Sequence, residues 1–101
     1  MPPLKTKDIS TQLKAVPEWR KRAQVIRRTY KFAGFPEAMD FVNRVAKVAQ
    51  KNGHHPDIDI RYSEVTLALT SHDEGGLTPK DFSLAKQADE IFAKVGGGAR
   101  G

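Results

Sequence analysis

Apolar residues recur at helical spacing in two long segments of the chain. In the first, which opens with FPE at 35–37, they stand at Ala38, Phe41, Val42, Val45, Ala46 and Ala49. In the second, which opens at Thr78-Pro79, they are Phe82, Ala85, Ala88, Ile91, Phe92 and Val95. A stripe of this width is typical of a helix that packs one face on a core. We expect Gly53 to end the first helix as a left-handed C-cap and Thr78 to cap the second.

Apolar and polar residues alternate in a shorter region before the first long helix. The alternation predicts two strands, over 18–21 and 25–32, with a polar turn around Arg22. The apolar face of the longer strand carries Ile26, Tyr30 and Phe32. Arg28 breaks the alternation. We therefore expect a β-hairpin here, with one face toward a core.

A second hairpin follows from the region between the two long helices. Ile58, Ile60 and Tyr62 alternate with polar residues, and the apolar members of 65–70 alternate with smaller or more polar ones. Ser63-Glu64 forms the expected connection. One apolar and one polar face is what an antiparallel sheet with helices on a single side requires.

A short helix is expected near the N-terminus. Asp8 or Ser10 fits its N-cap, Leu13 and Val16 its apolar face, and Pro17 stops it. The order of elements is then helix, hairpin, helix, hairpin, helix. No strand–helix–strand unit is long enough for a doubly wound parallel sheet, so the pattern predicts an α+β fold.

The composition limits the class of protein. A chain of 101 residues fits one domain, and we expect that domain to cover 1–101, with about 1–7 and 96–101 flexible. Cysteine is absent, which excludes disulfides, thiolate metal ligands and a cysteine nucleophile. The chain has no apolar run of about 18 residues and no secretory h-region, so we expect a cytoplasmic protein.

Charge is distributed unevenly along the chain. Residues 1–31 carry a net charge of +7 and the remainder a net −2. This asymmetry is compatible with a nucleic-acid surface or with a solvated strand face whose basic residues shield a sheet edge. No aromatic platform or known reading motif accompanies the basic residues, so we favour the solvated face.

The candidate chemistry lies around three histidines. His54 and His55 follow the expected end of the first long helix, and His72 stands where the last strand ends, before Gly75-Gly76. Neutral imidazole is well suited to proton transfer at physiological pH. If the helix runs alongside the last strand, the histidines converge at one end of the sheet. The alternative is that they fill ordinary hydrogen-bonding or surface roles.

Asp81 lies nine positions after His72, in the first turn of the last helix. A carboxylate there could orient an imidazole and fix its tautomer. The same residue completes a capping box with Thr78, so it serves as a cap, as an orienting group, or as both. Three histidines and a carboxylate could also bind zinc, but adjacent histidines do not match the usual ligand spacing, so we expect no metal.

The run from residue 52 to residue 91 resembles the pterin-4a-carbinolamine dehydratase family. The shared features are HHP, an aromatic residue six positions after its proline (Tyr62), alternating strand residues, a threonine or serine before histidine, a glycine turn and an aspartate opening the last helix. Upstream, Trp19, Ile26 and the segment YKFAGFPEAMDFVNRVA also match. The resemblance implies an α+β fold: a four-stranded antiparallel sheet with three helices on one face.

The resemblance also implies an activity, the dehydration of a 4a-hydroxytetrahydropterin to quinonoid dihydropterin in tetrahydropterin recycling. Its implied partners are the pterin substrate and further copies of the chain, as a homodimer or homotetramer. From the composition and motifs we expect no membrane or nucleic-acid partner, and the acid–base reaction needs no cofactor. Members of this fold also serve as non-catalytic interaction modules, such as a transcriptional dimerisation cofactor or an assembly factor. The presence of all the histidines and the aspartate favours the enzyme.

The implied catalytic residues are His54, His55, His72 and Asp81, and the implied substrate contacts are the three histidines and Gln50. We expect His55 to protonate the leaving hydroxyl, His54 or His72 to act on N5 or to orient the ring, and Asp81 to hold His72. At Gln50 the chain departs from the family, whose members often have glutamate there. An amide can hydrogen-bond but carries no charge, so this departure bears on the rate more than on the reaction type.

Overall fold

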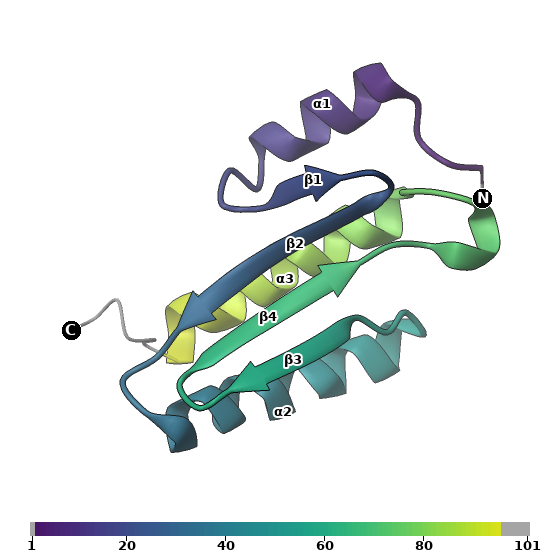
Figure 1. Ribbon diagram of the computed structural model, residues 1–101. Coiled ribbons are helices and arrows are strands. Elements are labelled where there is room, and N and C mark those ends of the chain that lie inside the picture. Colours follow the sequence, from purple (N-terminus) through teal and green to yellow (C-terminus); the bar gives the residue numbers. More distant parts are fainter. Residues whose placement is uncertain (1, 96–101) are drawn as a thin grey trace.

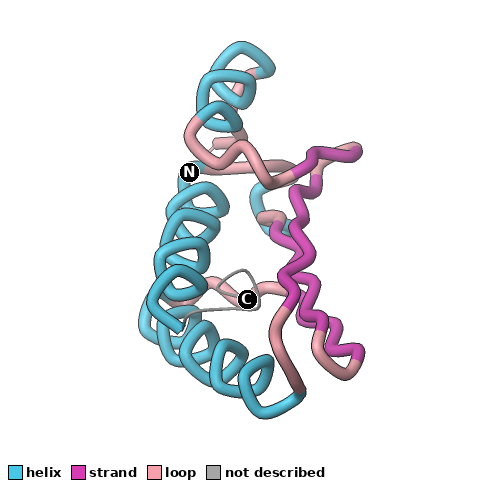
Figure 2. The backbone as a smooth tube through the Cα atoms, turned by 90° about the vertical axis from the view of Figure 1, so that its left-hand side faces the viewer, coloured by secondary structure: helices cyan, strands magenta, loops and turns pink. Residues whose placement is uncertain are grey.

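Four antiparallel strands form one sheet, and three helices cover one of its faces (Figures 1 and 2). The structure is a computed structural model and describes residues 2–95. Its elements are α1 (Thr6–Lys14), β1 (Arg20–Arg22), β2 (Val25–Lys31), α2 (Phe35–Asn52), β3 (Asp57–Arg61), β4 (Glu64–Leu69), the 3₁₀ helix η1 (His72–Glu74) and α3 (Pro79–Val95). The expected fold class and element order are confirmed.

The sheet joins the two hairpins through their longer strands, in the order β1-β2-β4-β3. In the central pair Ile26 faces Leu69 and Tyr30 faces Val65. All four of these side chains are buried, so they mark the face that meets the helices. β1 and β3 are the two edges. All three residues of β1 are basic and exposed, which agrees with the basic residues shielding an edge.

The core lies between this face and the two long helices. Gly53 ends α2 with a left-handed backbone (φ 65°), as expected. The buried residues of α2 are Ala38, Phe41, Val42, Val45 and Ala49. Ala46 was expected among them but is exposed, because it lies about 100° around the helix from Val45, beyond the face that meets the sheet. On α3, Leu84 is buried although the sequence pattern did not include it.

Several element ends differ from the expectation. α1 has Lys5 at its N-cap position with no side-chain cap, so Asp8 and Ser10 lie inside the helix and do not cap it. The hairpin turns fall at 23–24 and 62–63, one residue away from the expected positions. Ala23 and Tyr62 open these turns with positive φ, each 53°. Glycine and asparagine are the usual residues there, so the sequence lacked the ordinary turn signal.

Arg28 breaks the alternation of β2 because it faces inward and pairs with a carboxylate of α3. Oδ1 of Asp89 accepts hydrogen bonds from Trp19 Nε1 (3.0 Å), Arg28 (2.8 Å) and the Tyr30 hydroxyl (2.6 Å). The Arg28 guanidinium also lies 4.3 Å from the centre of the Tyr30 ring. Burial, and then the bond to Asp89, raise the pKa of Tyr30 well above its usual value. The hydroxyl therefore stays protonated and donates.

The N-terminal segment packs beside the loop that follows β4. The Leu4 amide donates to the Leu77 carbonyl at 2.7 Å, and a Cβ added at Gly76 would lie 3.2 Å from Pro3. The expected flexibility of 1–7 stays a prediction, and the expected flexible tail at 96–101 lies outside the described residues. No helix within residues 2–95 is long and apolar enough to cross a membrane.

Candidate active site

The end of α2 determines where the adjacent histidines lie. The Gly53 amide donates to the Gln50 carbonyl and the His54 amide to the Ala49 carbonyl, which is the pattern of a Schellman motif. This motif requires a left-handed residue, which glycine supplies without strain. The chain therefore leaves the helix sharply at His54 and enters β3 after Pro56. His54 becomes partly buried and His55 stays exposed.

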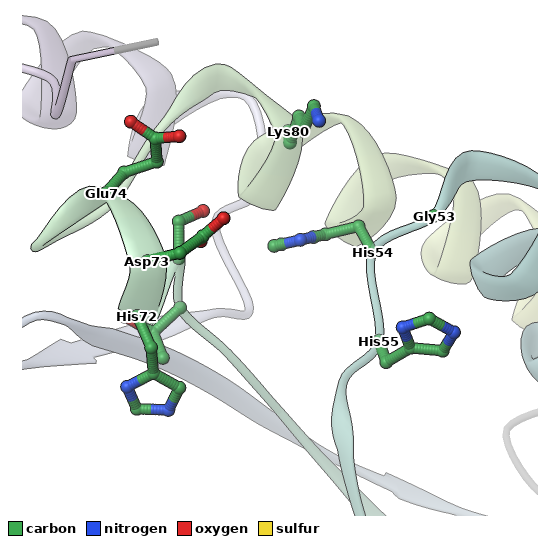
Figure 3. Close-up of a pocket in the computed structure, with 9 residues that line it drawn as sticks. Gly53, His54, His55, His72, Asp73, Glu74 and Lys80 are labelled. Carbon is green, nitrogen blue, oxygen red and sulfur yellow. The ribbon is translucent and has the colours of Figure 1, made fainter.

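The third histidine comes from the other side of the same space. After β4 the backbone forms an isolated bridge between Ser71 and Gly76, and η1 with His72 is the loop that this bridge encloses. A cavity of about 340 Å³ lies between this loop and the end of α2 (Figure 3). All three histidines line it, together with Asp73, Glu74 and Lys80. The expected convergence of the histidines at one end of the sheet is confirmed.

Asp81 lies in the first turn of α3, is fully buried, and accepts hydrogen bonds from three donors. Its Oδ2 accepts from the Ser71 hydroxyl and from the Thr78 backbone amide, each at 2.9 Å. Its Oδ1 lies 2.6 Å from Nε2 of His54. A carboxylate can only accept, so Nε2 of His54 carries the proton and Nδ1 has the lone pair. Asp81 thus caps the helix and also orients an imidazole.

The imidazole that Asp81 orients is His54, and the expectation that it holds His72 is wrong. The first turn of α3 packs beside the end of α2, which brings Asp81 to His54. His72 lies on η1, and its ring points away from His54 (Figure 3). Among the described residues the His72 ring has no side-chain hydrogen-bond partner.

Gln50 forms a hydrogen bond with His55, the other histidine of the adjacent pair. It lies on the last turn of α2, and its Oε1 is 3.0 Å from Nε2 of His55. The amide oxygen accepts from Nε2–H, so Nδ1 of His55 remains available. His54 and His55 are therefore each held through Nε2, one by a carboxylate and one by an uncharged amide.

Sequence reasoning missed two residues that complete this network. Ser71 is buried, donates to Asp81, and lies 3.0 Å from the hydroxyl of Thr78, which was expected only as a cap. The alternation of β4 places position 71 on the same inward side as Leu69. A serine at an inward position needs a partner, and this signal could have pointed to Asp81. The sequence pattern contained no comparable signal for Asp73, Glu74 or Lys80, which also line the cavity.

The described residues do not form a metal site. Within 2–95 there is no group of three or more histidine, aspartate or glutamate side chains arranged to hold an ion. What the site offers is two oriented imidazoles, a third imidazole on the facing wall, and a buried carboxylate behind one of them. This is an arrangement for moving protons to and from a small molecule.

Comparison with known proteins places the chain in a family. The family model described as pterin 4 alpha carbinolamine dehydratase matches residues 2–91. The chain belongs to this family. A protein of Chloroflexus aurantiacus, provisionally named a pterin-4-alpha-carbinolamine dehydratase, is 54% identical over 92 residues, covering 91% of this chain and 99% of that protein. A protein of Picosynechococcus with the same provisional name is 50% identical over 84 residues, covering 83% and 91%.

Two solved structures share the fold. A transcriptional coactivator/pterin dehydratase from Brucella melitensis has a TM-score of 0.85 and 31% identity, over 88% of this chain and 97% of that one. A pterin dehydratase-like protein described as a RuBisCO assembly factor has a TM-score of 0.60 and 16% identity, over 72% and 84%. At that identity the second shows a common architecture alone.

Proposed function

We propose that the protein dehydrates a 4a-hydroxytetrahydropterin to the quinonoid dihydropterin, in the recycling of tetrahydropterin. The observation that carries the proposal is the cavity that all three histidines line, with His54 held by buried Asp81. Family membership and the 54% identical relative support the same reaction. A cavity of about 340 Å³ is also of the size that binds small organic molecules.

His54 is the base for the proton on N5. Its Nε2–H is committed to Asp81, so Nδ1 presents a lone pair. When Nδ1 takes the N5 proton the ring becomes an imidazolium, and the carboxylate at 2.6 Å stabilises the new charge. The electron pair of the N5–H bond then forms the N5=C4a double bond.

His55 is the acid for the leaving hydroxyl. In its protonated form it donates Nε2–H to Gln50 and Nδ1–H to the oxygen on C4a. The C4a–O bond breaks with its electron pair on oxygen, and the proton from His55 completes a water molecule. One proton leaves N5 and one is given to oxygen, and no electrons are exchanged with another reagent. The step therefore needs no redox partner.

His72 is assigned to the substrate ring. It lies on the facing wall of the cavity, and no side chain of the described residues holds it. A donor in that position can contact the ring while His54 and His55 act on N5 and C4a. Positioned acid–base groups of this kind contribute about 10²–10⁴-fold to a rate.

The test is to add purified protein to freshly generated 4a-hydroxytetrahydropterin and follow the absorbance decay. We expect acceleration over buffer, and we expect His55→Ala to lower turnover at least about tenfold while the circular dichroism spectrum is unchanged. Lys86→Ala, on the exposed side of α3, is the control and should match the wild type. A wild-type rate for His55→Ala would remove His55 from the mechanism. No acceleration by the wild type would favour a non-catalytic interaction module.

We also infer that the chain forms a homodimer or homotetramer. β3 is an edge strand, and its Ile58 and Ile60 are 36% and 38% exposed although they point to the helix-covered face. An edge with exposed apolar side chains is a surface that a second copy could cover. Light scattering during size-exclusion chromatography tests this, and a monomer at high micromolar concentration would contradict it.

A further inference from the structure

A second cavity adjoins the candidate active site on the α2–α3 side. It measures about 240 Å³ and is lined by Asn52, His54, Lys80, Ser83 and Leu84. His54 and Lys80 also line the cavity of the three histidines, so the two spaces meet at this pair of side chains. Lys80 lies on the first turn of α3, above the His54 ring in Figure 3.

The bonding within the pterin ring determines which part of the substrate lies next to His54. In a tetrahydropterin N5 is bonded to both C4a and C6. If His54 takes the proton from N5, any substituent on C6 leaves the ring beside His54. The second cavity lies next to His54 and is not lined by His72, so it offers space for that substituent.

The charges around the two cavities indicate the kind of substituent. Lys80 is the only lysine or arginine among the described residues that line either cavity. The acidic residues, Asp73 and Glu74, belong to the η1 wall and do not line the second cavity. Asn52 and Ser83 add an amide and a hydroxyl to the side with Lys80.

The second cavity also has an apolar part. Leu84 is 2% exposed and forms the buried portion of the lining. A short carbon chain between the ring and a charged end group can lie against it. Lys80 itself is exposed, so its ammonium would meet the end group near solvent, where an ion pair contributes modestly.

We propose that the second cavity binds a C6 substituent that carries a carboxylate or phosphate, and that Lys80 determines this preference. The inference rests on the proposed function, because it takes N5 to lie at His54. In this proposal Lys80 contacts the substituent and takes no part in the proton transfers. Its effect therefore falls on KM and leaves kcat nearly unchanged.

The experiment compares two 4a-hydroxytetrahydropterins, one with methyl at C6 and one whose C6 chain ends in a carboxylate. With Lys80→Met we expect the KM for the carboxylate substrate to rise about three- to tenfold. The KM for the methyl substrate and both kcat values should stay within about twofold. Lys80→Arg should keep most of the preference, and Lys86→Met, a lysine on α3 outside both cavities, is the matched control.

The outcomes separate this inference from the proposed function. Equal effects of Lys80→Met on both substrates, or a loss of kcat with both, would overturn the assignment of Lys80 to the substituent. No effect on either substrate would overturn it as well. In each of these cases the wild type still dehydrates the methyl substrate, whereas failure of the proposed function would leave both substrates at the buffer rate. A KM for the carboxylate substrate that rises with salt in the wild type, and not in Lys80→Met, would support it further.

Discussion

Asp81 and Asp89 lie on the same helix and both accept hydrogen bonds, Asp89 through Oδ1 alone and Asp81 through both oxygens. Each collects three hydrogen-bond donors from other parts of the chain or from the start of its own helix. The donors to Asp89 are an indole, a guanidinium and a phenol that face the core. The donors to Asp81 are a hydroxyl, a backbone amide and the imidazole of His54.

The two carboxylates differ in whether one of their donors also faces a cavity. Trp19, Arg28 and Tyr30 line neither of the two cavities at the candidate site, and the Asp89 cluster joins β2 to α3. His54 has a second nitrogen and a cavity of about 340 Å³ beside it. The partly buried carboxylate of Asp89 therefore stabilises packing, whereas the fully buried carboxylate of Asp81 fixes a tautomer. In this molecule the carboxylate at the candidate site is the one whose partner, His54, also lines a cavity.

The largest expected effect is on activity, from Asp81→Asn. The one oxygen of asparagine would accept from Ser71 and Thr78, which turns the NH₂ group toward His54. Nε2 of His54 would then have to accept, and its Nδ1 would carry the proton and cease to be a base. We expect kcat to fall at least about hundredfold in the dehydration assay. Asp89→Asn is the control and should keep a wild-type kcat per folded molecule. A hundredfold loss of kcat in Asp89→Asn as well would contradict the assignment of separate roles to Asp81 and Asp89.

The next effect is on stability, from Asp89→Asn. Arg28 and Asp89 are only 17% and 25% exposed, so removal of the charge leaves a partly buried guanidinium without its counter-ion. We expect the free energy of unfolding in urea to fall by about 1–3 kcal/mol. Asp40→Asn removes the exposed pair with Arg44 and should cost no more than about 0.5 kcal/mol. Equal costs for the two variants would show that the Asp89 cluster adds nothing to packing.

Ser71→Ala should give an intermediate result in both assays. It removes one donor to Asp81 and the contact with Thr78, while the bond from His54 remains. We expect kcat to fall about three- to tenfold and the free energy of unfolding by about 1 kcal/mol. Thr66→Val, which removes an exposed hydroxyl bonded to Thr29 on the other face of the sheet, should leave kcat unchanged. A kcat for Ser71→Ala as low as that of Asp81→Asn would mean that the hydroxyl does more than support the carboxylate.

The smallest effect is a loss of stability in alkaline solution that depends on Tyr30. Because folding raises the pKa of this phenol, its contribution to stability is complete below about pH 10 and declines as the pH rises further. We expect the free energy of unfolding to fall above pH 10 in the wild type and in the exposed control Tyr62→Phe, and to fall less in Tyr30→Phe. Identical slopes in all three proteins would contradict the burial of the phenol beside Asp89.

The sequence predicted well wherever local pattern decides the structure. The stripes of α2 and α3, the cap at Gly53 and the histidines beside it follow from spacing within a single segment. The shifted turns at Ala23 and Tyr62 could not be predicted, because both residues have a positive φ, which alanine and tyrosine rarely adopt. The pairing of the strands on either side of each turn requires it, with Arg22 opposite Val25 and Arg61 opposite Glu64.

The partners of Asp81 and Asp89 could not be predicted from the sequence for a different reason. Whether Asp81 meets His54 or His72 depends on how α3 packs against α2, and residue spacing carries no such information. The pairing of Arg28 with Asp89 is similar, since it joins residues 61 positions apart. In the sequence it was visible only as a break in alternation.

The most direct test of the account is a crystal structure of the protein with a stable pterin analogue bound. The account predicts N5 within hydrogen-bonding distance of Nδ1 of His54, roughly 2.6–3.2 Å, with Nε2 still bonded to Asp81 and with His55 beside C4a. An analogue bound outside the cavity of the three histidines, or one in it whose N5 faces away from His54, would contradict the account.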